Sequence, residues 1–544
     1  MSDGKDLSTL KEQVQQGRIG RRELLRRAAA LGLSAPVISG LLAACAPSGT
    51  PKPSAAGSSS AAAGNPNGKI TYGLGSDWQT LDPTFYTNVA EREIFYSIFD
   101  PLVDMDEKLE IKPRLAKSWD VQDGGKTIVF NLEPNVKFHD GTSCDAAAVK
   151  FNLERMLDPK TGSPQRTNID AITAVEAVDA TTVRLRLKQA FTPLLGSLTE
   201  GPGFISSPMA VQKAGKDYGL RPVGTGPFTF VEWLKADQIR LKRNDAYWRA
   251  GLPKFADLVW KPIPDETVKM ANFTAGTIDV IDNVPANDRK TIRGNPSYGT
   301  WDAPGTRWPM MRLNVVKAPF TNKLVRQAVS HAVNRDDIIK AVYFGEAVPA
   351  LGPISPVYKS YYDPDVEKYG FGYDPAKARA KLAASGATNV TFTVEIQNVA
   401  SQQRLAELIK ENLAAVGITM NIQPYAVTAF QDRLTNKLYQ AAIGSWTPRP
   451  DIDGTVYRHF ATDGNVNSMS YSNPAVDALL QQSRTLPNGP ERVKVYRDVQ
   501  KLIVDDAPWV FLIFETQTRA WQKTVSGIPQ IPDVMIRFAE AVRS

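Results

Sequence analysis

The chain has 544 residues, of which 42% are hydrophobic and 22% are charged, so it is long enough to build two or more domains with substantial cores. Its formal net charge is +7; residues 1–44 hold seven Lys and Arg against four Asp and Glu, or +3, which leaves +4 for the remainder. This mild charge, with no cluster of Lys and Arg interleaved with aromatic residues, argues against nucleic acid as a partner.

The first 45 residues have the pattern of an export signal. A basic segment at 18–27 precedes an apolar run at 28–44, which is too short and too rich in Ala and Gly to be a stable membrane span. The adjacent Arg21 and Arg22 resemble a twin-arginine signal, which directs proteins that are exported already folded, although two neighbouring positions depart from its usual residues. We therefore expect residues 1–45 to be a signal peptide and no part of the fold.

A lipid attachment site is predicted at the end of this signal. The run Leu42-Ala43-Ala44-Cys45 resembles a bacterial lipobox, in which the cysteine becomes the lipidated first residue of the mature protein. Acyl chains gain about 0.8 kcal/mol per buried methylene, so a lipidated Cys45 would tether the protein to a membrane without spanning it. The alternative is an ordinary signal peptide with an incidental cysteine. Residues 46–68, rich in Ser, Ala, Gly and Pro, predict a flexible linker, and Cys144 is the only later cysteine, which leaves no intrachain disulfide.

Strand and turn patterns dominate the chain from residue 69 to about 300. The glycine-rich run at 224–228 invites comparison with a phosphate loop, but Pro227 interrupts it and no Gly-Lys-Ser/Thr follows, so we interpret it as a turn. Strands are expected at 69–73, 126–132, 181–187 and 238–241, and helices at 90–99 and 144–156.

Helical patterns dominate from residue 323 onward. Helices are expected at 325–342, from Asp374-Pro375 to Gly386, and at 401–416, where Gly417 is well placed as a cap. The last of these lies between strand-like segments at 390–396 and 418–422. Strand, helix and strand with short connections predict parallel pairing. A second α/β lobe therefore begins near residue 305.

The end of the chain predicts a return to the first lobe. Two more helices are expected, one from Asn473-Pro474 and one at 491–505, and a buried strand at 508–514. The tail after this strand is short for a domain. The predicted organisation is therefore a signal peptide at 1–45, a linker at 46–68, a first lobe at 69–305 plus 512–544, and a second lobe at 306–511.

Nine short segments occur in one order along nearly the whole mature chain, and together they identify a family. They are Leu81-Asp82-Pro83, Phe99-Asp100-Pro101-Leu102-Val103, Leu115-Ala116-Lys117-Ser118-Trp119, Val136-Lys137-Phe138-His139-Asp140-Gly141-Thr142, Val223-Gly224-Thr225-Gly226-Pro227-Phe228, Arg243-Asn244-Asp245-Ala246-Tyr247-Trp248, Val325-Arg326-Gln327-Ala328-Val329, Tyr373-Asp374-Pro375-Ala376-Lys377-Ala378 and Asp506-Ala507-Pro508. The chain resembles the extracytoplasmic solute-binding proteins of ABC importers, specifically the dipeptide/oligopeptide/nickel-binding family, family 5. The resemblance implies two α/β lobes joined by two hinge strands, an extra subdomain in the first lobe at about 108–220, and a ligand cleft between the lobes.

This resemblance also implies a function. A lipid-anchored, monomeric receptor would capture a peptide-like or other small organic solute outside the membrane and deliver it to ABC permease subunits. Its location would be the periplasm or the outer face of the cytoplasmic membrane, according to the type of cell envelope. Closure of the lobes around the solute would create the surface that a permease recognises. Two alternatives are a secreted hydrolase acting on a small oligomeric substrate and a solute sensor for a membrane receptor.

The candidate ligand residues follow a predicted strand. Residues 444–454 come after the strand-like 440–443, at the carboxyl end where open α/β sheets bind ligands. Peptide-binding relatives carry a Trp here and, three residues later, an Asp that holds the α-amino group of the peptide. This chain keeps Trp446 but has Arg449 at that spacing. Because a guanidinium favours a carboxylate or phosphate, we expect a ligand with an anionic group near Arg449, stacked on Trp446.

Other interpretations of this loop stay open. Arg449 could pair with Asp451 or Asp453 as a brace, and Asp451 could restore an amine site if the loop shifts. Tyr86 has a spacing seen in metal-chelate-binding relatives, and Trp308 lies near the expected hinge, although packing explains either residue.

Two more arginines are candidate ligand residues, and the sequence lacks the patterns of metal and catalytic sites. Arg307 and Arg458 are candidate second cations. Only three histidines occur and no pair has metal-ligand spacing, while a Gly-x-Ser-x-Gly elbow is absent from the sequence. We therefore predict that the protein is not an enzyme and that it binds neither a metal nor a cofactor.

Overall fold

The computed structural model describes residues 64–544. The predicted signal peptide, the lipidation site at Cys45 and the predicted linker up to residue 63 lie outside the described residues. Within the described part, no helix combines the length and apolar character that crossing a membrane requires.

One twelve-stranded sheet is the central element of the fold. Its main path has the order β15-β14-β16-β12-β18-β11-β1-β10-β9-β8, with β13 paired to β18 and β17 paired to β12. The strands are β1 (Lys69–Leu74), β8 (Phe228–Leu234), β9 (Gln238–Arg243), β10 (Asp257–Pro262), β11 (Val280–Ile281), β12 (Tyr298–Leu313), β13 (Ala347–Pro349), β14 (Thr391–Gln397), β15 (Thr419–Tyr425), β16 (Ala441–Trp446), β17 (Trp509–Phe511) and β18 (Ile513–Gln522).

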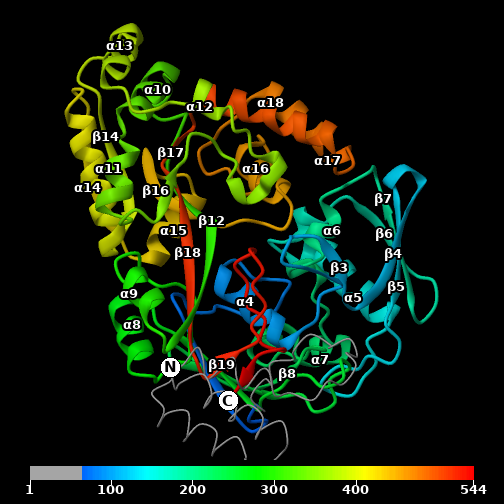
Figure 1. The fold of residues 1–544 in the computed structure, drawn as a ribbon. Coiled ribbons are helices and arrows are strands. Elements are labelled where there is room, and N and C mark those ends of the chain that lie inside the picture. The colour runs from blue at the N-terminus through cyan, green and yellow to red at the C-terminus, as the bar shows by residue number, and fades with distance from the viewer. Residues whose placement is uncertain (1–63) are drawn as a thin grey trace, which may run out of the picture. The chain divides into compact units, whose positions relative to one another are not determined.

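Two long strands, β12 and β18, connect the two halves of this sheet (Figure 1). The start of β12 pairs antiparallel with β18 from Tyr298 to Ala303, and its end pairs with β16 and β17. The register shifts between Ala303 and Arg307, where Gly305 has φ +70°, a backbone conformation that glycine adopts readily. We call the half with β1 and β8–β11 the first lobe and the half with β14–β17 the second lobe.

Helices cover the sheet in both lobes. The first lobe carries α4 (Val89–Ile98), α8 (Glu266–Thr274) and α9 (Arg289–Gly294). The second lobe carries α10 (Lys323–Ala332), α11 (Arg335–Ala341), α12 (Val366–Tyr369), α13 (Pro375–Ser385), α14 (Ala400–Ala414), α15 (Val427–Thr435), α16 (Asp453–Phe460), α17 (Pro474–Thr485) and α18 (Pro490–Asp506). The segment from Val525 to Ala541 packs into the same core as Tyr72 and Trp260 of the first lobe.

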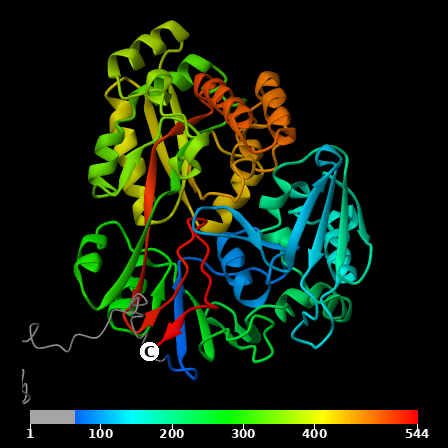
Figure 2. The same cartoon turned by 45° about the vertical axis from the view of Figure 1, so that its right-hand side comes forward.

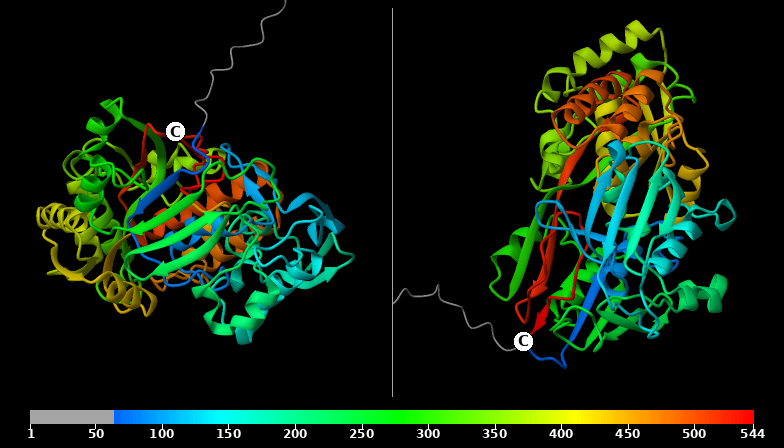
Figure 3. Two further views of the ribbon diagram at one scale, coloured as in Figure 1. Left: turned by 90° about the horizontal axis from the view of Figure 1, so that it is seen from below. Right: turned by 90° about the vertical axis from the view of Figure 1, so that its right-hand side faces the viewer.

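A separate four-stranded antiparallel sheet builds a subdomain beside the first lobe (Figure 2). It has the order β4-β5-β7-β6, and both views of Figure 3 show these strands as a layer of their own. Its strands are β4 (Ala116–Gln122), β5 (Thr127–Leu132), β6 (Ile172–Ala177) and β7 (Thr182–Leu187), and its helices are α5 (Ala146–Leu157) and α6 (Leu194–Ser197). The helix α7 (Pro208–Ala214) packs against the core of the first lobe. Cys144 lies in this core, and its burial raises the pKa of the thiol.

The predicted strand-helix-strand unit of the second lobe is confirmed. β14 and β15 pair in parallel, and α14 lies between them in the chain. Gly417 ends this helix as predicted, since it has φ +86°, donates to the Ala414 carbonyl at 3.0 Å, and is followed by Ile418, which donates to the Leu413 carbonyl at 3.0 Å. These are the two hydrogen bonds of a Schellman motif.

The single helix predicted at 325–342 is wrong, because the chain forms α10 and α11 with a break at 333–334. Val333 is the C-cap of the first helix, and Asn334 begins the second, since its side chain accepts hydrogen bonds from the N–H groups of Asp336 and Asp337. The buried Arg335 guanidinium then donates to backbone carbonyls, including that of Val333 at 3.1 Å. Capping and this buried arginine hold the break in place.

The strand predicted at 508–514 is also two strands, β17 and β18, separated at Leu512. The Leu512 carbonyl accepts from the Ala350 N–H at 3.1 Å instead of continuing one ladder. The predicted lobe boundary at 305/306 falls inside β12, and the boundary at 511/512 falls between β17 and β18. The domain ranges stay predictions.

Glu93 in α4 predicts a pH dependence of stability. Its buried carboxylate accepts a hydrogen bond from the Tyr72 hydroxyl at 3.0 Å, and burial raises its pKa from 4.5 to about 8, against the opposing charge of Arg519. The folded protein therefore holds this proton more tightly than the unfolded chain, so the stability that it contributes is full below about pH 4.5 and is lost as the pH rises through 8. We expect denaturant unfolding at pH 5 and pH 8.5 to show a larger loss for the native protein than for Glu93→Gln. Equal losses in the two proteins would contradict this assignment.

Candidate functional site

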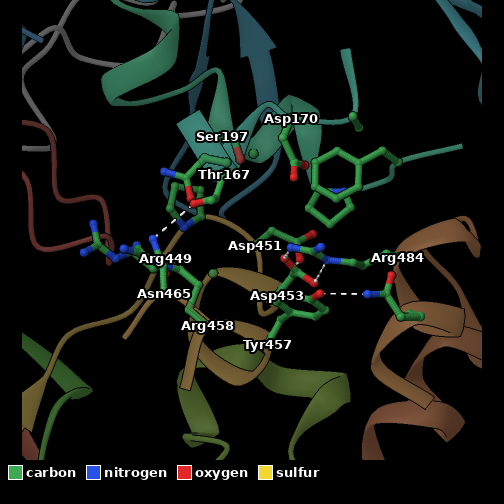
Figure 4. Close-up of a pocket in the computed structure, with 18 of the residues that line it drawn as sticks. Thr167, Asp170, Ser197, Arg449, Asp451, Asp453, Tyr457, Arg458, Asn465 and Arg484 are labelled. Carbon is green, nitrogen blue, oxygen red and sulfur yellow. Dashed lines mark hydrogen bonds and ion pairs between the residues drawn. The ribbon is translucent and has the colours of Figure 1, made fainter. Parts of the chain in front are cut away.

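A cavity of about 320 Å³ lies between the subdomain and the second lobe. The segment around α6 supplies Ser197 and Glu200, and the loop after β16 supplies Arg449 and Asp451. The last turn of α16 adds Arg458. Figure 4 shows side chains from both sides meeting across the cavity. Its volume is at the lower end of the range for small-molecule sites.

Arg449 lines the cavity, and Trp446 lies against its guanidinium. Trp446 is the last residue of β16, and its ring N–H donates to the Thr455 hydroxyl at 3.2 Å. The Arg449 guanidinium carbon lies 4.9 Å from the Trp446 ring centroid, within the range of a cation–π contact. Since β16 ends at Trp446, the sequence placed the start of the loop three residues too early.

Arg449 is an incompletely paired buried cation. Its side chain is 11% exposed, and its Nη1 lies 3.6 Å from the Glu200 carboxylate, beyond hydrogen-bond distance. Within residues 64–544, neither Nε nor Nη1 of Arg449 has a hydrogen-bond partner. Burial, followed by the positive charge of Arg92, lowers the pKa of Arg449 to about 10. The folded protein thus holds this charge at a cost.

The first lobe contributes Tyr86 and Arg92 to the same cluster, and the subdomain contributes Glu200. Arg92 lies in α4, and its Nη2 contacts the Glu200 Oε2 at 2.5 Å. The Tyr86 ring lies against Gly201, because a Cβ at that glycine would stand 2.1 Å from the Tyr86 Cε1. Burial and the neighbouring Glu200 raise the pKa of Tyr86 to about 12, and its hydroxyl finds no partner among the described side chains and backbone groups.

Arg458 is the second cation on the Trp446 ring. Its guanidinium carbon lies 5.7 Å from the ring centroid, and its Nε donates to the Asn465 side chain at 2.9 Å. Asn465 in turn donates to Thr167 of the subdomain at 3.1 Å. Desolvation lowers the pKa of Arg458.

Asp451 and Asp453 have other partners than Arg449. The Asp451 carboxylate accepts two hydrogen bonds from Arg492, at 2.7 and 2.8 Å. The Asp453 carboxylate accepts from Arg484 at 2.8 and 3.0 Å. The predicted alternative, in which Arg449 braces the loop by pairing with Asp451 or Asp453, is therefore wrong, because Arg492 and Arg484 are the partners of these carboxylates.

Trp308 and Arg307 lie apart from the cavity lining. Trp308 is 2% exposed and packs against Tyr358 and Phe514 in the core of the second lobe. Arg307 lies 3.4 Å from the Glu515 carboxylate, which also pairs with Arg289 at 2.8 Å.

Arg92 and Glu200 were not predicted from the sequence as residues of the site. Arg92 belongs to a short helix in which every residue from Ala90 to Ile98 is buried, although three of them are charged. A helix with charges on its buried faces is the one signal that pointed to an unusual environment.

Removing one hydrogen bond across the cleft is expected to speed the release of ligand. Thr192 of the subdomain donates its N–H to the Arg484 carbonyl at 2.9 Å and its hydroxyl to the Leu486 carbonyl at 2.6 Å. Thr192→Val keeps the volume and the first hydrogen bond but removes the second. One hydrogen bond contributes about 1 kcal/mol, so we expect ligand to dissociate roughly fivefold faster, with little change in association, in stopped-flow fluorescence. Thr173→Val, which removes a hydroxyl on the exposed side of the subdomain, is the matched control; equal dissociation rates in the two variants would contradict the prediction.

Three comparisons place this geometry among known proteins. A family model described as "Bacterial extracellular solute-binding proteins, family 5 Middle" matches residues 110–468. The glutathione-binding protein GsiB of Pectobacterium atrosepticum is 31% identical over 489 residues, which span 86% of this chain and 93% of that protein. Two solved structures share the fold over 88% of this chain. AgaA of A. tumefaciens R10 in complex with agropinic acid has a TM-score of 0.81 at 26% identity, over 99% of its chain, and DppA of Helicobacter pylori in complex with the peptide STSA has 0.80 at 25% identity, over 98% of its chain. All three relatives are described as binding proteins.

Proposed function

Because the chain belongs to the bacterial extracellular solute-binding proteins of family 5, we propose that it captures a small organic solute with an anionic group and delivers it to the permease of an ABC importer. The relatives support this class of function, since GsiB is named for glutathione and AgaA is bound to agropinic acid. Both of those molecules carry carboxylates, and the larger peptide STSA bound to DppA carries one at its C-terminus.

The observation that carries the proposal is the Arg449 guanidinium. It is buried between the lobes, and two of its nitrogen atoms have no hydrogen-bond partner in residues 64–544. A carboxylate or phosphate at this position would accept charge-assisted hydrogen bonds and offset the desolvation of the arginine. Because Asp451 is already bound bidentately by Arg492, an amine of the ligand has little to gain from that carboxylate.

The remaining parts of the proposal concern location and movement. Export through the signal at 1–45, lipidation at Cys45 and a monomeric receptor are supported by the sequence pattern and the family. The solute would bind while the lobes are apart, and bending at β12 and β18 would close them, with lobes at 69–305 plus 512–544 and 306–511. Closure that buries the solute couples binding to the surface offered to the permease.

The test is a thermal-shift screen of the mature protein and of Arg449→Met. The panel contains glutathione, acidic amino-acid conjugates, neutral peptides, oligosaccharides and metal chelates. A ligand at 100 times its dissociation constant adds about 2.7 kcal/mol of apparent stability. We expect an anionic member to stabilise the native protein and to lose this effect in Arg449→Met. Equal stabilisation of both proteins by neutral peptides would overturn the anionic solute, and consumption of the ligand would support a hydrolase instead.

A further inference from the structure

The charges of the cleft do not balance. Two guanidinium groups, from Arg92 and Arg449, share one buried carboxylate, that of Glu200, and a third, from Arg458, lies over the same Trp446 ring as Arg449. Glu200 lies 2.5 Å from the Arg92 nitrogen and 3.6 Å from that of Arg449, so most of its charge is committed to Arg92. Three positive charges against one negative charge leave the cluster at +2.

The other charged groups around the cavity have their own partners or face water. Asp451 and Asp453 are paired with Arg492 and Arg484. The remaining charged lining groups lie nearer to solvent: Lys188 and Asp170 are partly exposed and 4.0 Å apart, and the exposed Asp463 accepts a hydrogen bond from the Tyr457 hydroxyl. These groups therefore contribute little to neutralising the buried arginines.

The two second-lobe arginines are held close to each other by Trp446. Their guanidinium carbons lie 4.9 and 5.7 Å from the centroid of the same ring. Arg458 is further fixed by Asn465, which reaches Thr167 across the cleft. Burial, and then the positive charges of Arg92 and Arg458, lower the pKa of Arg449.

A ligand with a single negative charge would leave one uncompensated positive charge in this enclosed space, which is costly. We propose that the solute carries two anionic groups, one bound by Arg449 and the other by Arg458. This inference rests on the proposed function, since it specifies the ligand of the same site. The small cavity and the shared Trp446 ring favour a compact molecule in which the two groups are a few bonds apart.

The test compares diacids with their monoamides. The two pairs are glutathione with the same tripeptide amidated at its glycine carboxyl, and adipate with adipamic acid. Calorimetric titration of the mature native protein is expected to show at least tenfold tighter binding of the diacid in one pair or both. In Arg458→Gln this preference should fall to less than threefold, and Arg458→Lys, which keeps the charge, should retain part of it. A ligand-free melting curve of each variant confirms that it is folded.

The outcomes separate this inference from the function that it rests on. Equal binding of diacid and monoamide to the native protein in both pairs, including no binding of either, overturns the second anionic group whether or not the variants fold. If the monoacids still stabilise the native protein but not Arg449→Met, the proposal of an anionic solute is supported and only the proposal of a second anionic group is wrong. If no anion in the screen stabilises the native protein, both proposals fall.

Discussion

Replacing Arg449 with methionine is expected to stabilise the ligand-free protein and, at the same time, to weaken anion binding by a factor of about 30 or more. The two effects have one cause. Burial and the charge of Arg92 disfavour the guanidinium in the absence of ligand, as its lowered pKa of about 10 indicates. Exchange of buried charges for apolar groups of similar volume often stabilises proteins by about 1–4 kcal/mol. Loss of a buried ionic partner costs binding about 2–5 kcal/mol, and each 1.4 kcal/mol is tenfold in affinity.

Two measurements check this prediction. Chemical unfolding without ligand gives the change in the free energy of unfolding, and calorimetric titration gives the change in affinity. Arg240→Met is the matched control, because it removes the same charge from an arginine that is 45% exposed and pairs with Glu232. A variant that loses stability together with affinity would show that Arg449 is a structural brace after all.

Breaking the ion pair between Asp451 and Arg492 is expected to be among the most damaging single changes to stability. The Arg492 side chain is 1% exposed, and both oxygens of the Asp451 carboxylate accept from it. Asp451→Asn leaves a buried guanidinium without its counter-charge, which typically costs about 3–5 kcal/mol. Denaturant unfolding of the mature protein without ligand measures this loss directly.

A double variant separates pairing from other causes. Asp451→Asn combined with Arg492→Met removes both charges and should recover a substantial part of the lost stability. Asp498→Asn, which breaks an exposed pair with Lys494, should change stability by less than about 0.5 kcal/mol. If Asp451→Asn instead weakens the binding of amine-containing ligands while leaving the stability unchanged, Asp451 belongs to an amine site.

Much of the second lobe could be predicted from the sequence because its elements are separated by strong local signals. Gly417 ends α14, and the apolar alternation of β14 and β15 requires no knowledge of the rest of the chain. The local sequence pattern did not predict the break between α10 and α11, for a physical reason. Val325 and Val329 of the first helix and Ile338 of the second pack into one core, so their apolar spacing continues across the break.

Most of the candidate site that could be predicted lies on the side of the second lobe. Trp446 and Arg449 follow a strand in a family pattern, and the structure brings Tyr86 and Arg458 to the same region. Arg92 and Glu200 lie more than 240 residues earlier in the chain, and no local pattern relates either residue to the loop after β16. Their role follows from the way the subdomain and the second lobe face each other, which depends on the whole fold.

Arg92 and Arg449 approach the same carboxylate from opposite lobes. This arrangement has a consequence for the amount of ATP that transport consumes. Closing the empty protein brings like charges together in a desolvated space, so closure without a solute is opposed. An importer that responded to empty closed receptors would hydrolyse ATP with nothing to carry. If the proposed anionic solute binds here, the unbalanced arginines would act as a safeguard against futile cycles, since the solute would make the closed form favourable.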